Sequence, residues 1–309
     1  MPGRAFRFGL VARTLAPGEA WADKARRAEQ LGYAVLTMPD HFRNQLAPVP
    51  ALTAAALATT RLRVGSLVFA VDFHHPAVLA REVAAMDQLS GGHFELGLGA
   101  GWLRAEYEEA GIRYDAAGTR IERLAEAVTI IKGLLTGERV TFAGRHYTIT
   151  GLEGRPGVQQ PRPPILIGGG GRRTLTLAGR EADIVGLVPR ARTDGGGLEW
   201  DDFGAPALLE KLAWVREAAG ERFAALELNT LIQAAVVTDD TAAAAEQLAT
   251  RFHTTPELVW DCPYALVGTA EEIAETIQQR RERYGISYLS IFEQDAEAFA
   301  PVVAKLAGT

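Results

Sequence analysis

Residues 62–99, LRVGSLVFAVDFHHPAVLAREVAAMDQLSGGHFELGLG, contain one complete strand–helix–strand unit. The apolar run at 62–71 predicts a buried strand, and the pattern at 76–89, with a proline in its first turn, predicts a helix. Ser-Gly-Gly ends the helix, and residues 93–97 predict another buried strand. Two apolar strands joined by a helix are typical of a parallel βαβ unit, whose strands are buried on both faces.

The same alternation extends along the whole chain. Eight predicted strands, nearly all separated by helices, favour an α/β fold of the closed (β/α)8 TIM-barrel type over an open doubly wound sheet, which is the alternative. A hairpin predicted at 139–150 interrupts the alternation. The remaining strands are expected at 6–12, 33–38, 165–168, 183–187, 226–237 and 286–291, and the remaining helices at 19–31, 50–60, 119–135, 174–180, 206–219, 242–252, 270–284 and 296–306.

The chain is expected to form one barrel domain over residues 1–309, because barrels of this kind routinely reach this length. Three inserted segments are expected, around 139–160, 188–204 and 252–268. The second of them is rich in Gly and Asp, which is typical of a mobile loop over one end of a fold.

The composition is that of an ordinary globular protein, with 48% hydrophobic and 23% charged residues. A net charge of −6 gives no reason to expect nucleic acid or an anionic membrane as a partner. No apolar stretch reaches the roughly 18 residues that a membrane span needs, and the first residues lack the apolar core of a signal peptide. The single cysteine, Cys262, excludes an internal disulfide. We therefore expect a soluble, cytoplasmic protein.

The first candidate site residues, Asp40 and His41, directly follow the strand predicted at 33–38. Catalytic groups of a TIM barrel lie at the C-terminal ends of its strands. Histidine, with an ordinary pKa of about 6.5, can act as an acid or a base near neutral pH, and a neighbouring carboxylate can orient it. A solvated loop pair is the competing interpretation. His74 and His75 lack a third ligand nearby, so no metal site is predicted.

Three further strand ends carry small residues. Ser66 lies in the run at 62–71, where a small residue would let a flat ring approach closely. A buried strand that begins at a small residue is the competing interpretation. The run Gly97-Leu98-Gly99-Ala100-Gly101-Trp102 has G-x-G-x-G spacing, which is not the dinucleotide fingerprint G-x-G-x-x-G. Gly99 and Gly101 would admit a planar ligand close to the backbone, and Trp102 could stack or belong to the core.

The third of these strand ends is followed by the glycine quartet, Gly168, Gly169, Gly170 and Gly171. Four glycines contribute no side-chain packing, and Arg172 and a helix come next, so we predict an anion site built from backbone N–H groups. A flexible connector is the alternative. Together with a ring site near Asp40 and Ser66, the quartet predicts a phosphorylated tricyclic cofactor across the barrel mouth.

At this point the sequence resembles the bacterial luciferase-like superfamily of flavin- and deazaflavin-dependent oxidoreductases, in particular its F420-dependent branch. The segments that carry the resemblance are PDHF at 39–42, residues 64–112, and PRPPILIGGGGRRTLTLAGREADIV at 161–185. The resemblance implies a (β/α)8 barrel with inserted segments, usually dimeric, that binds either FMN or the deazaflavin F420 and acts on a small molecule.

The resemblance also implies roles for single residues. Asp40 and His41 would line the site beside the cofactor ring, and a cis peptide bond, matching Ser66–Leu67 here, would press on that ring. The quartet with Arg172 would hold the cofactor phosphate. The sugar phosphate dehydrogenases of the superfamily carry a glutamate where Trp102 stands, so this chain is expected to lack that proton donor and to have an apolar pocket walled by Trp102.

F420 is the cofactor that the resemblance favours, with FMN as the alternative. The expected reaction is hydride transfer between C5 of the deazaflavin and an unidentified small organic substrate, with His41 moving the accompanying proton and Asp40 orienting it. An FMN-dependent monooxygenase is the first alternative. A non-catalytic cofactor-binding protein is the second.

Overall fold

The computed structural model describes residues 4–309. Eight strands form a closed parallel ring, in which the last strand along the chain pairs with the first. The predicted TIM barrel is therefore confirmed, and the open doubly wound sheet is excluded. In order around the ring, the strands are β1 (Arg7–Val11), β2 (Val35–Met38), β3 (Arg63–Ser66), β5 (Phe94–Gly99), β8 (Ile165–Gly169), β9 (Ile184–Leu187), β10 (Glu227–Leu231) and β13 (Tyr288–Phe292).

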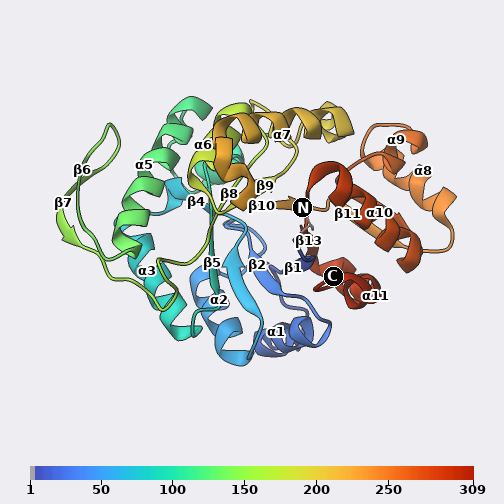
Figure 1. The fold of residues 1–309 in the computed structure, drawn as a ribbon, viewed down its shortest axis with the longest axis horizontal. Helices are drawn as coiled ribbons and strands as arrows, with labels where there is room; N and C mark the ends of the chain where they lie inside the picture. The colour runs from blue at the N-terminus through green and yellow to red at the C-terminus, as the bar shows by residue number, and fades with distance from the viewer. Residues whose placement is uncertain (1–3) are drawn as a thin grey trace.

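Helices pack around the outside of this ring (Figure 1). Three of them, α3, α10 and α11, have the bounds that the sequence predicts, and α10 shows why such bounds can be predicted. It begins at a capping box between Thr269 and Glu272 and ends at Gly285, which has a φ of 77°. The helices of the ring are α1 (Trp21–Gln30), α2 (Pro48–Ala58), α3 (Pro76–Leu89), α5 (Ala117–Leu135), α6 (Arg172–Glu181), α7 (Ala205–Ala219), α10 (Ala270–Tyr284) and α11 (Ala296–Leu306).

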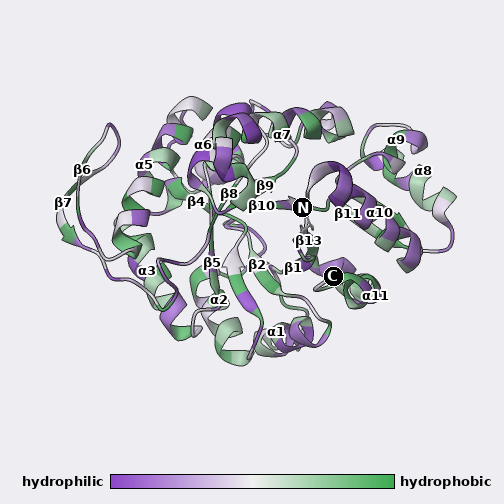
Figure 2. Cartoon of the chain, in the orientation of Figure 1, coloured by the Kyte–Doolittle hydropathy of each residue, from purple (hydrophilic) through white to green (hydrophobic). Residues whose placement is uncertain are grey.

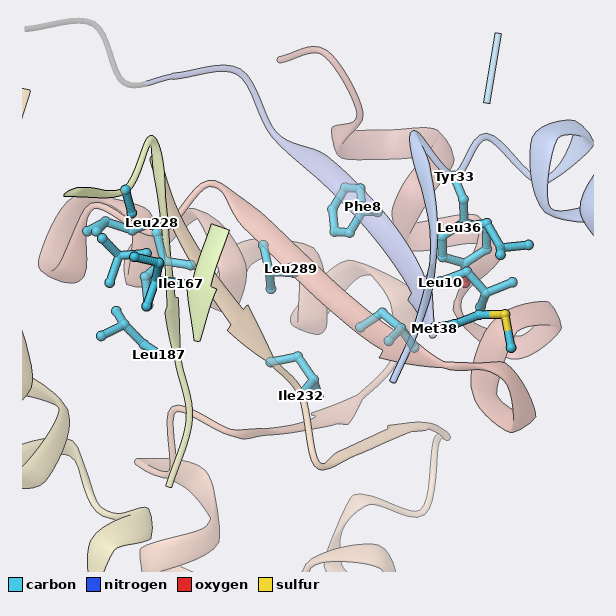
Figure 3. Packing of buried hydrophobic residues seen from close by; sticks show 14 of the residues in the cluster. Phe8, Leu10, Tyr33, Leu36, Met38, Ile167, Leu187, Leu228, Ile232 and Leu289 are labelled. Atoms are coloured by element: carbon cyan, nitrogen blue, oxygen red, sulfur yellow. The ribbon is translucent and has the colours of Figure 1, made fainter. Parts of the chain in front are cut away.

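Two buried apolar layers hold the barrel together. The larger layer joins strands to helices, as where the rings of Phe8 in β1 and Phe299 in α11 lie 5.9 Å apart. Figure 3 shows part of this layer, including Phe8, Leu36 and Ile167 from three strands. A smaller cluster, with Tyr288 as its largest member, fills the interior of the ring. Hydrophilic residues of the helices, clearest on α10, lie beside hydrophobic ones in Figure 2, as expected when one helix face packs on the barrel.

Two predicted strands are wrong in detail. The run at 62–71 is not one strand, because β3 ends at Ser66 and is followed by the short β4 (Phe69–Ala70) and the 3-10 turn η1 (Val71–Phe73). The run at 226–237 also divides. Its second half, β11 (Ala234–Val237), leaves the ring and pairs in parallel with β12 (Ala265–Gly268), which the sequence did not reveal. Apolar composition alone cannot show where a chain leaves one sheet for another.

The segments expected as insertions lie outside the ring. At 139–160, β6 (Arg139–Ala143) and β7 (Thr148–Glu153) form the predicted hairpin, which projects beside α5 in Figure 1. The 188–204 segment contains the 3-10 turn η2 (Trp200–Phe203). The last segment follows α8 (Thr241–Arg251) and contains α9 (Pro256–Trp260). In it, the thiol of Cys262 is buried against the carbonyl oxygen of Phe203, at 3.4 Å.

None of the helices within residues 4–309 has both the length and the apolar character needed to cross a membrane.

Candidate active site

His41 lies directly after β2 and pairs with a buried carboxylate. Its Nδ1 is 2.8 Å from Oε2 of Glu106, and the Glu106 side chain is only 3% exposed. Glu106 belongs to α4 (Arg104–Glu109), a short helix that sequence reasoning missed. The sequence contains only a weak signal for Glu106, namely a carboxylate four residues after Trp102 at the start of an amphipathic turn.

Glu106 corrects one sequence-based expectation. Trp102 stands at the position where the resemblance implied a glutamate in sugar phosphate dehydrogenases, but the site does not lack a carboxylate. Glu106 brings one to His41 from one helical turn further along. Trp102 itself is half-buried, and its ring meets the His41 ring edge-on, with centroids 6.2 Å apart and planes at 90°. The Trp102 ring thus borders His41, and its role as a wall of the substrate pocket stays a prediction.

Asp40 has a different set of partners from His41. Its Oδ2 accepts a hydrogen bond from the backbone N–H of Ala70 at 3.2 Å and lies 2.8 Å from Nε2 of His74. His74 directly precedes the N-cap of α3, which is His75. His74 instead orients Asp40, so that each of the two adjacent residues after β2 belongs to its own histidine–carboxylate pair.

A second polar network, centred on Asp72, holds α4 in place through Tyr107. The Tyr107 hydroxyl donates to Asp72 Oδ2 at 3.1 Å, and Arg123 Nε donates to Asp72 Oδ1 at 2.8 Å. Burial raises the pKa of the Asp72 carboxyl, although Arg123 opposes this effect. Burial, reinforced by Asp72, raises the pKa of Tyr107 above its usual range, so its phenol stays protonated at neutral pH. The network fixes Tyr107, and with it the helix that presents Glu106.

A cavity of about 330 Å³ opens beside this network, between η1, α5 and the β6–β7 hairpin. This volume is at the lower end of the range for small-molecule pockets. His74 lines the cavity and also contacts Asp40, so the cavity adjoins the Asp40 side of the site. Its lining residues are Val71, Asp72, Phe73, His74, His75, Ile112, Arg113, Arg123 and Tyr147.

Ser66 has a structural contact that the prediction did not foresee. Its hydroxyl donates to the carbonyl of Gly97 at 2.8 Å and accepts from the N–H of Gly97 at 2.9 Å, which links β3 to β5. Strand pairing therefore continues through Ser66, and the predicted cis bond at Ser66–Leu67 is wrong by one residue. The non-prolyl cis bond joins Leu67 and Val68, the first two residues past the strand.

The glycines after β5 are required by neighbouring side chains. Gly101 has a φ of 71°, and a Cβ placed there would overlap the hydroxyl of Tyr107. A Cβ on Gly99 would lie 2.5 Å from Cγ2 of Val68. The space beside these two glycines is thus filled by the protein itself. Their predicted contact with a cofactor stays a prediction.

The glycine quartet begins at the same rim. A Cβ on Gly168 would lie 3.1 Å from Cγ1 of Val68, so the quartet starts next to the segment that follows β3. A Cβ on Gly169 would come within 2.6 Å of Thr174 Cγ2, so packing requires this glycine, contrary to the expectation that the quartet has no packing role. At Gly171, the N-cap of α6, a Cβ would meet no heavy atom within 4 Å.

The first turn of α6 follows directly from this open position. The first N–H groups of a helix have no partner inside the helix and favour an anion. Arg172, predicted to assist, is 64% exposed, and its Nη2 lies 3.6 Å from Oε2 of Glu217 on α7. The structure thus brings Asp40, Leu67 and the quartet to one rim, whereas the Arg172 side chain lies along the neighbouring helix.

The 188–204 segment spans this rim. Arg190, near its start, packs against Gly170, where a Cβ would lie 2.7 Å from the Arg190 Cα. At its tip, the carbonyl of Asp194 accepts a hydrogen bond from Arg104 Nε at 3.0 Å, and the carbonyl of Gly195 accepts one from the Arg104 N–H at 3.3 Å. The segment therefore connects the quartet to the start of α4.

Among residues 4–309, no group of three or more His, Cys, Asp or Glu side chains is arranged to hold a metal ion.

Comparisons with known proteins identify the family of the chain. A family model described as "Luciferase-like monooxygenase" matches residues 9–285. An F420-dependent glucose-6-phosphate dehydrogenase of Microbacterium testaceum is 33% identical over 189 residues, which cover 57% of this chain and 55% of that relative. An F420-dependent hydroxymycolic acid dehydrogenase of Mycobacterium tuberculosis is 30% identical over 228 residues, 71% of this chain and 59% of that relative.

A solved structure shows the same fold over nearly the whole chain. The F420-dependent tetrahydromethanopterin reductase of Methanopyrus kandleri aligns with a TM-score of 0.76 and 18% identity, covering 98% of each chain. The matches to the two sequence relatives extend over little more than half of their lengths. Because the family model spans most of the described residues, the chain belongs to the luciferase-like monooxygenase family.

Proposed function

We propose that this protein is an F420-dependent oxidoreductase that transfers a hydride between C5 of the deazaflavin and a small organic substrate. The observation that carries the proposal is the His41–Glu106 pair at the rim where Asp40, Val68 and the glycine quartet meet. A proton-transfer group and an anion cradle on one rim are what such a cofactor reaction requires. Two relatives whose names specify F420-dependent dehydrogenases support the choice of cofactor.

The residues at the rim fit such a cofactor. Gly171 leaves open space at the N-terminus of a ten-residue helix, which suits a phosphate. The backbone of Leu67, whose N–H donates to the carbonyl of Met38 at 2.7 Å, lies near Asp40 and suits a flat ring. When bound, F420 would supply a two-electron hydride donor or acceptor. Arg172 would have to leave Glu217 to reach the phosphate, and its high exposure leaves it free to do so.

His41 is the proposed proton carrier of the reaction. A carboxylate at Nδ1 favours the tautomer with its proton on that nitrogen, which leaves Nε2 as the base. Glu106 would hold the ring in this orientation, and Asp40, itself fixed by His74, would bind the cofactor ring or orient the substrate. General acid–base help of this kind contributes on the order of 10²–10⁴-fold to a rate. Trp102 would form an apolar wall of the substrate pocket.

An FMN-dependent monooxygenase is the second candidate, because the family model is described as a luciferase-like monooxygenase. The direct test is a titration of the purified protein with F420 and with FMN, followed by fluorescence quenching. Tighter binding of F420, together with single-turnover reduction or oxidation of a candidate substrate, supports the proposal. Preferential binding of FMN would replace it by the monooxygenase. Binding of F420 without any turnover across a panel of acceptors and alcohols would favour a cofactor carrier.

We also propose that the protein is a homodimer that associates through α2 and α3. Exposed apolar side chains on these helices support this, since Leu57 is 65%, Leu89 54% and Val78 44% exposed. Sedimentation velocity of the wild type and of Leu57→Glu tests it, because a charge in a dimer interface should give monomers.

A single barrel domain with three inserted segments is proposed as well. The cytoplasmic location stays a prediction.

A further inference from the structure

A lysine and an aspartate form a buried ion pair behind the glycine quartet. Lys211 of α7 has an exposed fraction of 0%, Asp202 one of 2%, and the Lys211 ammonium donates to Oδ2 of Asp202. The ammonium also lies 3.3 Å from the hydroxyl of Tyr264. Burial lowers the pKa of Lys211, and the hydrogen bond to Asp202 opposes this effect. Taking two charges out of water is expensive, so such a pair is weak evidence for stability and invites another explanation.

Asp202 holds more than the lysine. Its Oδ2 accepts a hydrogen bond from the backbone N–H of Arg190 at 2.5 Å, and its Oδ1 accepts one from Arg190 Nη2 at 3.0 Å. Two atoms of one carboxylate thus fix both the main chain and the side chain of the same residue. The backbone of Arg190 is therefore set by Asp202, and Asp202 is set by Lys211.

The backbone of Arg190 is in turn the wall against which the quartet packs. A Cβ on Gly170 would lie 2.7 Å from both the Cα and the N of Arg190, and 2.7 Å from the carbonyl oxygen of Val188. The N–H of Val188 also approaches the carbonyl of Gly169, at 3.4 Å. A shift of Arg190 would remove this contact with Gly170, and the backbone N–H groups of Gly170 and Gly171 could then change orientation.

We propose that Lys211 and Asp202 are positioning residues for the anion cradle. They fix the backbone of Arg190, which holds Gly170 and Gly171 in the conformation that presents their N–H groups to a cofactor phosphate. This inference rests on the proposed function, because the quartet is a phosphate site only there. The ligand class is a deazaflavin that carries a phosphodiester tail, and the pair acts on the tail rather than on the ring.

The test compares two ligands on two proteins. One ligand is F420, and the other is the deazaflavin chromophore without its phosphate tail. One protein is the wild type, and the other is Lys211→Met/Asp202→Leu, which replaces the pair with apolar side chains of similar volume and leaves the N–H of Arg190 without its acceptor. We expect the double variant to bind F420 about tenfold more weakly, the effect of losing roughly one hydrogen bond, and to bind the tail-free chromophore as the wild type does.

A purely structural role would not give this selective loss. The matched control is Glu227→Gln at the opposite end of the barrel, where Glu227 pairs with Arg7 at 2.6 Å. It should lower the melting temperature and leave the ratio of the two affinities unchanged. Should the double variant fail to fold, Asp202→Asn, which keeps the shape of the side chain, is expected to lower the ratio about threefold.

The outcomes separate this inference from the proposed function. A double variant, or Asp202→Asn, that keeps the wild-type preference for F420 over the tail-free chromophore would overturn the role of Lys211 and Asp202 alone. Equal affinity of the wild type for the two ligands would overturn the phosphate cradle itself, and the role of the pair with it.

Discussion

The two sides of the barrel rim are built in opposite ways. On the α4 side, the glycines after β5 are packed against Val68 and Tyr107, and the carboxylate of Glu106 is buried beneath His41. On the α6 side, Gly171 faces open space and the Arg172 side chain is largely exposed. The difference teaches that similar glycine-rich sequences can meet different physical needs: the run after β5 is packed at Gly99 and Gly101, whereas the quartet is packed at its first three glycines and open at Gly171.

The sharpest test of this division is His41→Ala on the packed side. Turnover should fall by about 10²–10⁴-fold, because a general acid or base is lost, while the affinity for F420 stays near that of the wild type. Single-turnover rates and cofactor titrations separate the two quantities. Unchanged turnover would show that the proton moves through another group and that the packed side is not the catalytic one.

Gly101→Ala, on the α4 side of the rim, should lower the stability of the protein rather than act on the chemical step. The added methyl group would overlap the Tyr107 hydroxyl at a φ of 71°, so we expect the free energy of unfolding to fall by about 2–4 kcal/mol. Urea denaturation measures this. Tyr107→Phe in the same chain should recover part of the loss, because it removes the nearest clashing atom. A Gly101→Ala protein as stable as the wild type would contradict the packing argument.

Glu106→Gln tests whether the buried carboxylate orients His41. The amide keeps the size of the side chain but weakens the hold on Nδ1, so turnover should drop about 10–100-fold, the usual effect of removing a partner that orients a histidine. Cofactor affinity should stay the same. Glu108→Gln is the matched control on the exposed face of the same helix, where no loss is expected. Equal activity of the two variants would remove Glu106 from the mechanism.

Substitutions on the α6 side of the rim should change only the affinity for the cofactor, and their effects should be the smallest. Gly171→Ala places a methyl group where there is room for it, so stability should change by less than about 1 kcal/mol. The affinity for F420 should fall several-fold, up to about tenfold, because the methyl group would occupy space meant for the phosphate. Arg172→Ala should weaken binding about threefold, and neither variant should slow the hydride step of the bound complex. A Gly171→Ala variant with wild-type affinity would place the phosphate elsewhere.

Much of this fold can be predicted from the sequence because parallel barrel strands are buried on both faces. Their continuous apolar runs predicted all eight strands of the ring, and Asp40 and His41 were found because they interrupt such a run at its end. The cis bond was misplaced by one residue, since the sequence cannot show that the Ser66 hydroxyl completes a pairing with β5. Glu106 was missed because a six-residue helix has too few turns to show a period.

The same limit explains the split at β10 and β11. Residues 226–237 contain neither glycine nor proline to mark a break, and the exit from the ring at Ile232 depends on pairing with β12, more than 30 residues away. The role of Lys211 also depends on partners outside its helix, Asp202 and Tyr264. The helical pattern alone does not distinguish it from an exposed lysine. Local periodicity predicts elements well, whereas contacts between distant segments must come from the fold.

Cys262 offers a built-in reporter for movement at the end of the 188–204 segment. Burial raises the pKa of its thiol, so little reactive thiolate exists in the folded state, and its sulfur is covered by Phe203 at the end of the 188–204 segment. A sulfhydryl reagent should therefore label the native protein only as often as that covering lifts. Labelling kinetics, with no engineered probe, would time the lifting directly and show whether a bound ligand slows it.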